Sequence, residues 1–428
     1  MDWKEEILNH LDREYTEPIR DTLWGHIYVS GELKRITGSL PFQRLGRIRQ
    51  LGPAFHVYPG ATHSRLSHSF GVFHIAKKII RKLICSPGCP ELSLRGVKAF
   101  LLASLFHDLG HFPYAHSLKE LPLEEHEVLS GRLLLSPPLS ELIAEEMGID
   151  PAAAAAVIDT SMDSGNSGEI NFFRNILSGV LDPDKLDYLN RDAFFCGVPY
   201  GMQDIDFVIT RIAPHRKAGI GISGQGVNAI ENILFSKYLM YKTVYWHKTV
   251  RIATAMVKKG VFLSLQEHCF SPEDLYGIDD TQFEHLFSES CSPYRPLIDG
   301  VKNRRLYKTA AEVDFSSDNS VHRRLTELGE RTTYEQFCAG ELSGSIGREV
   351  TPEQVIIDIP EPISFEIDLP IFTETGTVSF DSSRTVFSPP VIRGFSSSLR
   401  KVRLILPEEL LTAARSNAVD VEQLIGSS

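Results

Sequence analysis

The feature that most constrains this chain is an apolar segment that ends abruptly on a histidine and an aspartate. Residues 96–106 carry apolar side chains at three- and four-residue spacing, which predicts a buried helix that ends at His107 and Asp108. Gly110 and Pro113 then turn the chain. Because neighbours on a regular helix point about 100° apart, this imidazole and carboxylate converge on one cavity only around an ion or at a distorted helix end.

Histidine is unevenly distributed along the chain. Eight of the fifteen histidines lie between His56 and His126. Imidazole is the commonest metal ligand in proteins, and it is the side chain that titrates near neutral pH. The clustering therefore predicts a metal site or an acid–base site, which a single buried histidine would not.

Two further segments supply what an ion site still needs. In residues 60–72, His68 lies at a predicted helix start, and Arg65 precedes it by three residues. In residues 182–192, Asp184 offers a second carboxylate. On a helix Asp184 shares one face with Tyr188 and Asp192, at four-residue spacing, with Lys185 beside them.

Composition narrows the class of protein. The 428 residues predict a large domain with an appended one. A net charge of −11 argues against a general nucleic-acid surface, but it does not exclude an anionic small substrate. No apolar run approaches the ~20 residues that span a bilayer, and residues 1–15 lack the core of a signal peptide, so we expect a cytoplasmic protein without a membrane partner.

The six cysteines are scattered, which predicts reduced thiols and not a disulfide framework. Cys85 and Cys89 flank a Ser-Pro-Gly turn. A solvent-facing loop is the favoured interpretation of this pair, with half of a metal site or a redox pair as the alternative.

The pattern of apolar residues predicts a mainly α fold. We expect an N-terminal helix and hairpin over residues 1–40, a helical domain over 41–300 and a smaller C-terminal α+β module over 301–428. Helices are expected over residues 72–83, 96–106, 184–195 and 226–265, the last as two stacked helices or one bent helix.

Strands are expected at both ends of the chain. Residues 25–29 alternate loosely and are followed by a predicted turn at Ser30–Glu32. Residues 355–359, 364–369 and 401–406 are rich in β-branched residues and separated by prolines. The tail after Pro407 predicts one or two helices.

The order of these segments resembles the HD-domain phosphohydrolase superfamily, and within it the dGTPase-like dNTP triphosphohydrolases and their bacterial relatives. The resemblance covers roughly residues 20–310, weakly the rest, and implies an HD-domain helical core. The matching segments are 42–45 (FQRL), 50–52 (QLG), 63–72 (HSRLSHSFGV), 107–116 (HDLGHFPYAH), 126–127 (HE), 182–192 (DPDKLDYLNRD) and 244–248 (VYWHK).

The resemblance implies one divalent metal ion. Two imidazoles and two carboxylates suit Mn, Fe, Mg, Co, Ni or Zn, and they leave positions open for water and a phosphate oxygen. Such an ion polarises a phosphoryl oxygen and lowers the pKa of bound water. The implied ligands are His68, His107, Asp108 and Asp184. The alternative, that all four are ordinary polar residues at helix ends, is much the weaker one.

The phosphates of a nucleotide also need positive charge and a proton donor. Arg65 and Lys185 flank the presumed ligands, and Lys237 and Arg49 are further candidate cations. By resemblance, the acid near the leaving oxygen is His116, while His111 and His126 line the phosphate and water side.

The residue that would orient the acid departs from the family pattern. Relatives often carry a carboxylate three residues after the acid, where this chain has Lys119. We therefore expect Glu120 or Glu127 to orient His116.

The resemblance also implies contacts to the sugar. A tyrosine packed against C2′ excludes a 2′-hydroxyl by crowding, which would select deoxynucleotides. The alternative is that Tyr241 and Tyr245 are core aromatics at helical spacing, and the residues leave both interpretations open. The implied substrate residues are Gln50, Leu51, Lys185, Tyr188, Asp192, Lys237, Tyr241 and Tyr245.

Regulation is expected to differ from that of the relatives, whereas assembly is expected to follow theirs. Relatives that a nucleotide activates carry Asp and Arg in a guanine-reading motif, where this chain has Gly38 and Gly46. We therefore predict that a guanine activator site of that design is absent or altered. By resemblance we expect a homo-oligomer, a dimer or a tetramer.

Three functional hypotheses follow. The first is a dNTP triphosphohydrolase that releases deoxynucleoside and triphosphate. The second is an HD phosphatase or phosphodiesterase that acts on another nucleotide. The third is a non-catalytic nucleotide-binding module in which the metal site is structural.

Overall fold

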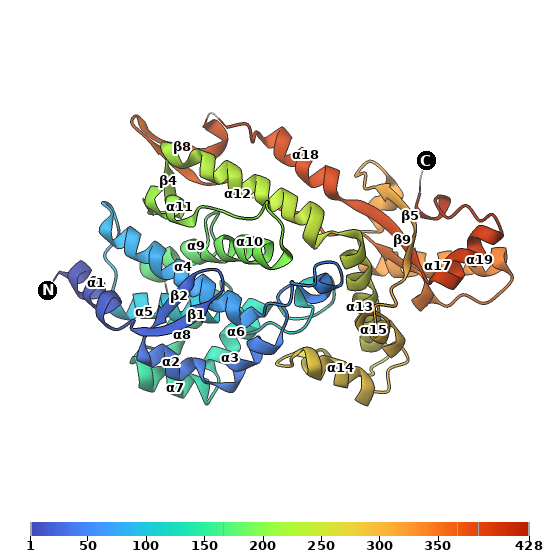
Figure 1. Cartoon of the computed structure of the whole chain (residues 1–428), viewed down its shortest axis with the longest axis horizontal. Coiled ribbons are helices and arrows are strands. Elements are labelled where there is room, and N and C mark those ends of the chain that lie inside the picture. The colour runs from blue at the N-terminus through green and yellow to red at the C-terminus, as the bar shows by residue number, and fades with distance from the viewer. Residues whose placement is uncertain (1, 166, 366, 384, 427–428) are drawn as a thin grey trace.

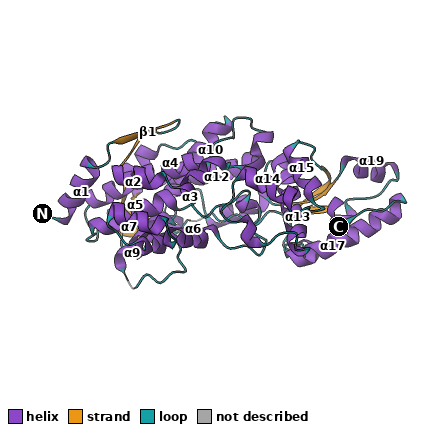
Figure 2. Ribbon diagram, turned by 90° about the horizontal axis from the view of Figure 1, so that it is seen from below, coloured by secondary structure: helices purple, strands orange, loops and turns teal. Residues whose placement is uncertain are grey.

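The computed structural model is elongated, with α1 (Trp3–Arg13) and α19 (Glu408–Ser416) at opposite ends (Figure 1). It describes residues 2–165, 167–365, 367–383 and 385–426. Helices dominate it, and three small sheets complete it (Figure 2). The mainly α fold predicted from the sequence is therefore confirmed. Within the described residues, every helix is too short or too polar to cross a bilayer.

The N-terminal segment forms a helix and a hairpin, as predicted. After α1, the strands β1 (Glu17–Asp21) and β2 (Gly25–Val29) pair antiparallel. The turn between them is organised by Asp21, because its Oδ1 accepts the N–H groups of Leu23 and Trp24 at 2.9 and 2.8 Å.

The turn predicted at Ser30–Glu32 is wrong. Ser30 is the N-cap of α2 (Gly31–Thr37), and its hydroxyl accepts the N–H of Leu33 at 3.2 Å. Serine satisfies a free N–H at a helix start as readily as it forms a turn, so the sequence signal was ambiguous.

Three helices that confirm the predicted apolar spacing position the site. They are α4 (Arg65–Cys85), α5 (Leu94–Phe106) and α10 (Pro183–Cys196), and α4 packs against both of the others. The side chains of Ser64, Ser93 and Asp182 cap their N-termini. These caps fix where the helices begin, so His68 and Asp184 both fall in a first turn.

The long segment predicted as two stacked helices or one bent helix is interrupted in its middle. α12 (Val227–Met240) passes into a π-helical turn (Tyr241–Tyr245), and α13 (Lys248–Gln266) follows. His247 caps α13 through Nδ1, which accepts the N–H of Thr249 at 3.2 Å. The π-helical turn widens the backbone where two of the candidate substrate tyrosines stand.

The remaining helices are distributed among several hydrophobic cores. They are α3 (Leu40–Arg44), α6 (His126–Leu135), α7 (Leu139–Met147), α8 (Pro151–Ile158), α9 (Gly168–Leu177), α11 (Ile205–Arg211), α14 (Asp280–Glu289), α15 (Arg295–Lys302), α16 (Ser320–Arg324), α17 (Leu328–Ile346) and α18 (Pro389–Leu399).

A three-stranded antiparallel sheet confirms two of the strands predicted near the C-terminus. Its order is β5 (Lys308–Asp314), β9 (Lys401–Leu406), β6 (Ile356–Asp358). The strand predicted over residues 364–369 is wrong, because the described residues of this range, all except position 366, form no strand. Leu369 N donates to Ile367 O at 2.8 Å instead, which bends the chain locally.

A four-stranded sheet was not predicted. Its order is β3 (Ile212–His215), β4 (Gly219–Ser223), β7 (Pro370–Thr373), β8 (Gly376–Ser379), and β4 pairs parallel with β7. The pairing joins segments about 150 residues apart, which no local pattern reveals.

Residues 301–428 contribute to three hydrophobic cores, and one of them, the core around α13, includes Ile356 and Ile405 of the three-stranded sheet. Phe365, Ile371 and Phe387 join the core of the first helices, and α18 runs along α12, where Phe395 stacks on Tyr238 with ring centroids 4.4 Å apart (Figure 1). The three-stranded sheet, α17 and α19 form a separate core. The domain boundary expected at residue 300 stays a prediction. Residues after it pack both in the core of the first helices and in the C-terminal core.

Candidate metal centre and active site

The four residues named as metal ligands face one another across three helix ends. His68 lies in the first turn of α4, His107 and Asp108 lie at the end of α5, and Asp184 lies in the first turn of α10. His68 Nε2 is 2.9 Å from Asp184 Oδ1, and His107 Nε2 is 3.3 Å from Asp108 Oδ1. The other two histidine–aspartate pairs, His107 with Asp184 and His68 with Asp108, are 3.8 and 3.9 Å apart.

Each imidazole is held so that Nε2 faces this cluster. Nδ1 of His107 lies 3.0 Å from Ser104 O, and a carbonyl can only accept, so Nδ1 carries the proton. His107 Nε2 is buried and has no hydrogen-bond partner among the described residues. His68 Nδ1 lies 2.8 Å from Asp187 Oδ2, the usual support of a metal-binding imidazole.

These positions fit a divalent ion. Ligand atoms about 2.0–2.2 Å from one ion lie roughly 3.0–3.6 Å apart when adjacent, close to the distances above. The side chain of Asp184 is 39% exposed, while those of His68 and Asp108 are 1% and 5% exposed. The donor set suits a borderline or hard cation, and its accessible side is the one next to Asp184.

The charges of the cluster also favour the binding of a cation. Burial alone would lower the pKa of His68, yet Asp184 and Asp187 outweigh it and raise that pKa to about 10. Burial would also raise the pKa of Asp184, but the hydrogen bond and charge of His68 keep it below its usual value. The carboxylates here thus attract a positive charge, which a proton or a cation can supply.

Asp187 is a site residue that the sequence interpretation missed. It is fully buried, and it accepts from Trp24 Nε1 at 2.5 Å, from His68 Nδ1 at 2.8 Å and from Arg191 Nε at 2.8 Å. Arg191 NH1 in turn donates to Asp21 Oδ2 at 2.8 Å. The N-terminal hairpin and α10 therefore jointly orient the imidazole of His68, a candidate metal ligand on α4.

Gly71 offered a sequence signal for this contact. It lies one turn after His68 in an otherwise apolar helix, where a glycine is unfavourable without a packing reason. A Cβ at Gly71 would lie 1.9 Å from Asp187 Oδ1. The glycine thus leaves the space that Asp187 of α10 occupies beside α4.

Asp108 connects the metal cluster with a second group of histidines. Arg65 NH1 donates to Asp108 Oδ2 at 2.7 Å, while Oδ1 lies 3.2 Å from His111 Nε2 and 4.0 Å from His126 Nε2. Burial raises the pKa of Asp108, but His111, His107 and Arg65 outweigh it and hold that pKa well below its usual range. Asp108 is therefore the shared carboxylate of both groups.

The three candidate acid–base histidines lie together beside Asp108. The rings of His111 and His126 stack with centroids 3.8 Å apart, and His116 lies 4.7 Å from His111. Burial, with the charge of Arg65, lowers the pKa of His116 to about 3 and that of His111 well below its usual value. Burial lowers the pKa of His126 to about 4. The group is neutral at pH 7 and can accept a proton or hold water.

The two carboxylates expected near His116 have other contacts. Glu127 Oε2 lies 3.1 Å from His126 Nδ1, so it belongs to the histidine group. Glu120 is ion-paired with Lys258 and Arg331. Its expected role as the hydrogen-bond partner of His116 is therefore unsupported.

The turn after Asp108 is fixed by backbone contacts. Arg44 is buried and donates to Leu109 O at 2.5 Å and to His111 O at 2.6 Å. Ser130 Oγ bridges Gly110 N and His107 O at 2.7 and 2.8 Å. Arg44 therefore supports this turn through the backbone.

The candidate sugar residues form an aromatic group next to α10. The ring of Tyr245 meets that of Tyr241 at 5.0 Å and that of Tyr188 at 6.4 Å, both edge to face. Tyr245 OH donates to Asp192 Oδ2 at 2.7 Å. His63, which the sequence interpretation missed, holds the other oxygen of Asp192 at 2.8 Å through Nε2. Both oxygens of Asp192 are thus positioned by the protein.

The other candidate substrate residues are placed differently from one another. Gln50 carries a buried Oε1 that has no partner among the described residues, and Leu51 packs against the core of the first helices. Lys185 Nζ donates to Gly179 O and Asp182 Oδ2, each at 2.8 Å. Lys237 Nζ donates to Ser364 O at 2.7 Å. Both ammonium groups thus have protein contacts that a phosphate would have to replace.

Arg49 also has a protein contact. Its guanidinium lies over the ring of Phe55, 4.3 Å from the centroid. Arg65 contacts the candidate metal ligand Asp108 directly, so it is placed to neutralise a phosphate bound there.

Comparisons with known proteins bear on this site. The family model of the HD associated region matches residues 208–386. The uncharacterized protein MJ1154 of Methanocaldococcus jannaschii is 32% identical over 308 residues, which are 71% of this chain and 62% of that protein. The deoxynucleoside triphosphate triphosphohydrolase SAMHD1 of Bos taurus is 25% identical over 408 residues, 83% of this chain and 68% of that protein.

A solved structure shares the fold. A protein from Aquifex aeolicus matches with a TM-score of 0.71 at 24% identity, over 94% of this chain and 99% of that chain. The match to the first curated relatives spans 55–62% of their length. What those longer proteins do as wholes therefore does not transfer directly.

Proposed function

The chain is related to the HD-domain phosphohydrolases, and from this premise we propose that it is a metal-dependent hydrolase of nucleotide phosphates. The observation that carries the proposal is that His68, His107 and Asp184 offer ligand atoms within 4.8 Å of one another, while Asp108 lies 3.3 Å from His107 and is shared with the neighbouring histidine group. This pairing of a cation site with neutral imidazoles suits phosphate ester hydrolysis.

A divalent ion held by these four residues would polarise a phosphoryl oxygen and activate water. The chain's own residues supply the rest. Arg65 neutralises phosphate charge next to Asp108. His111 and His126 hold the attacking water. His116 is neutral in the free protein; it would be protonated once the phosphates of the substrate offset the charge of Arg65, and it would then give that proton to the leaving 5′-oxygen, which is otherwise a poor leaving group.

The proposed substrate is a dNTP, cleaved to deoxynucleoside and triphosphate. On α10, Asp184, Tyr188 and Asp192 repeat every four residues, so one helix face runs from the metal cluster to the aromatic group. Tyr188 and Tyr245 would pack against C2′, and Asp192 would accept from the 3′-hydroxyl. Relatives such as SAMHD1 of Bos taurus support this class of substrate.

A product assay tests the proposal. The chain is incubated with each dNTP and Mn²⁺, and products are separated by chromatography. We expect deoxynucleoside and inorganic triphosphate in equal amounts. A matched panel of ribonucleotides, nucleoside monophosphates and cyclic nucleotides separates this activity from the second hypothesis. Hydrolysis of the panel alone would favour a phosphatase or phosphodiesterase.

Two further expectations belong to this proposal. We propose that a guanine activator site is absent or altered, because Gly38 and Gly46 replace charged residues of the family motif. Stimulation of nucleotide-free protein by GTP would contradict this. We also propose a homo-oligomer, a dimer or a tetramer, which light scattering of the purified chain tests.

A further inference from the structure

In the histidine group, the segment that joins His111 to His126 is a loop. Residues 111–125 connect the turn after Asp108 to α6, and only one short 3-10 turn, Ala115–Ser117, lies within them. Tyr114 has a left-handed backbone, with φ of +60°. The position of His116 therefore depends on what anchors this loop, because the loop lacks the regular hydrogen bonds of a helix or strand.

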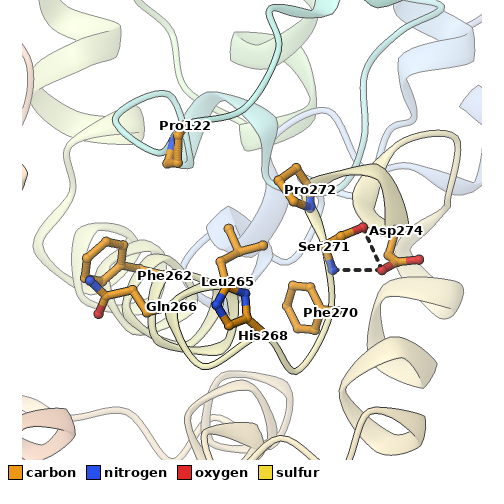
Figure 3. A pocket seen from close by; sticks show the side chains of 9 residues that line it. All are labelled: Pro122, Phe262, Leu265, Gln266, His268, Phe270, Ser271, Pro272 and Asp274. Atoms are coloured by element: carbon orange, nitrogen blue, oxygen red, sulfur yellow. Dashed lines mark hydrogen bonds between the residues drawn. The ribbon is translucent and has the colours of Figure 1, made fainter.

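Apolar contacts anchor the loop on one side. Leu118 and Leu121 are 0% and 4% exposed and belong to the core formed with α13. On another side the loop borders open space. Pro122 lines a cavity of about 550 Å³ together with Phe262 and Phe270 (Figure 3). Packing alone thus leaves the loop room to move there.

Glu120 stands between the two leucines in sequence and makes a charged anchor, in addition to the contacts of His111 O with Arg44 and of Glu124 N with Tyr276. Lys258 Nζ of α13 donates to Glu120 Oε2 at 2.5 Å. Arg331 of α17 donates through NH1 and NH2 to the two carboxylate oxygens, each at 3.0 Å. A bidentate arginine–carboxylate pair fixes orientation as well as distance. These charges lie in a poorly solvated place, since Arg331 is 3% and Glu120 15% exposed.

Arg331 is itself held firmly. Its Nε donates to Leu325 O at 2.9 Å, and NH2 also donates to Thr326 O at 3.2 Å. One helical turn later, Glu335 pairs with Lys259 and accepts from Ile357 N at 2.7 Å. α17 is thus tied both to α13 and to the three-stranded sheet, so it offers a rigid support.

We propose that Arg331 is a positioning residue: it holds, through Glu120, the loop on which His116 stands. The inference rests on the proposed function, in which His116 donates the proton. It assigns to α17, which lies outside the metal cluster, a part in the geometry of the acid. A misplacement of about 1 Å between reacting groups lowers rates as much as 10²-fold, so a small movement of this loop has a measurable effect.

The charge balance makes Arg331→Gln the informative variant. Without Arg331, Glu120 keeps its pair with Lys258, so no buried carboxylate is left alone. Glu120→Gln would instead leave Lys258 and Arg331 together without their anion. The matched control is Arg324→Gln, which removes an exposed pair with Glu330 in the same part of the fold.

Two measurements on the full chain test the proposal. Hydrogen exchange should show about 10-fold faster exchange of the amides of Leu118, Leu121 and Leu123 in Arg331→Gln, and no change in Arg324→Gln. With dNTP and Mn²⁺, kcat should fall about 10-fold in Arg331→Gln, with KM and bound metal within about twofold of wild type. Arg331→Lys keeps the charge but not the fork, so we expect an intermediate kcat.

Unchanged exchange of these amides in Arg331→Gln, or faster exchange with an unchanged kcat, would overturn the proposal. If Arg331→Gln does not fold, Arg331→Lys decides in the same way. Failure of the proposed function is distinguishable, because wild-type protein would then hydrolyse none of the nucleotides while hydrogen exchange still reported whether Arg331 anchors the loop.

Discussion

The two sides of the candidate site are built differently. The metal-ligand side stands on helix ends of α4, α5 and α10, and the buried carboxylate of Asp187 locks it from behind. The acid side stands on the loop of residues 111–125, which Glu120 ties to α13 and α17. The difference suggests that ion binding depends on the local helices, whereas proton transfer depends on contacts across the molecule.

Removal of a shared ligand should have the largest effect. Asp108 belongs to both groups, so Asp108→Asn should reduce nucleotide hydrolysis to background and release the metal. Metal content by atomic emission and a triphosphate assay check this. Asp12→Asn, which removes an exposed carboxylate paired with Arg81, is the control and should change neither. Full activity in Asp108→Asn would contradict the assignment of Asp108 to both sides of the site.

Replacement of the acid should separate the two sides. His116→Asn should lower kcat about 10²- to 10⁴-fold, the usual contribution of a general acid, while bound metal is unchanged. His26→Asn on the exposed face of the hairpin is the control. Loss of metal together with activity would mean that the loop side also holds the ion.

Replacement of Asp187 should affect the ligand side alone. Asp187→Asn weakens the support of His68, so metal affinity should fall about 10- to 100-fold. It also disrupts a buried pair with Arg191, which costs about 3–5 kcal/mol of unfolding free energy. Metal titration and thermal denaturation measure both. Asp206→Asn, at an exposed pair with Lys78, is the control; equal effects in the two variants would contradict the assignment.

The smallest expected effect is on the free energy of unfolding at acidic pH, through His74 on the ligand side. His74 stacks on Trp24, and burial together with Lys78 and Lys77 lowers its pKa to about 4. The unfolded chain binds a proton near pH 6.5 and the folded chain does not, so stability falls as pH drops from 6.5 towards 4.

His74→Gln removes this proton linkage. The loss of unfolding free energy between pH 7 and pH 5 should then be smaller than in wild type by about 2 kcal/mol. Denaturant melts at both pH values measure it. An identical pH dependence in the two proteins would show that His74 titrates alike in the folded and unfolded states.

Sequence patterns predicted the ligand side better than the acid side. The ligands lie in helices with regular apolar spacing, so these helices were predicted from local sequence, although they begin at Arg65 and Pro183 and not at residues 72 and 184. The partners of Glu120 were not, because Arg331 lies 211 residues away and reaches the loop only through the tertiary fold. For the same reason the parallel pair of β4 and β7 was missed, while β9 was predicted to the residue.

The most direct test of the central claim is a metal titration of chelator-stripped protein, followed by both Mn²⁺ binding and dNTP hydrolysis. We predict that one Mn²⁺ per chain restores triphosphate release in wild type, and that Asp184→Asn neither binds that ion tightly nor hydrolyses dNTP. Hydrolysis by the stripped protein, or full Mn²⁺ binding in Asp184→Asn, would contradict the assignment of His68, His107, Asp108 and Asp184 as the metal centre.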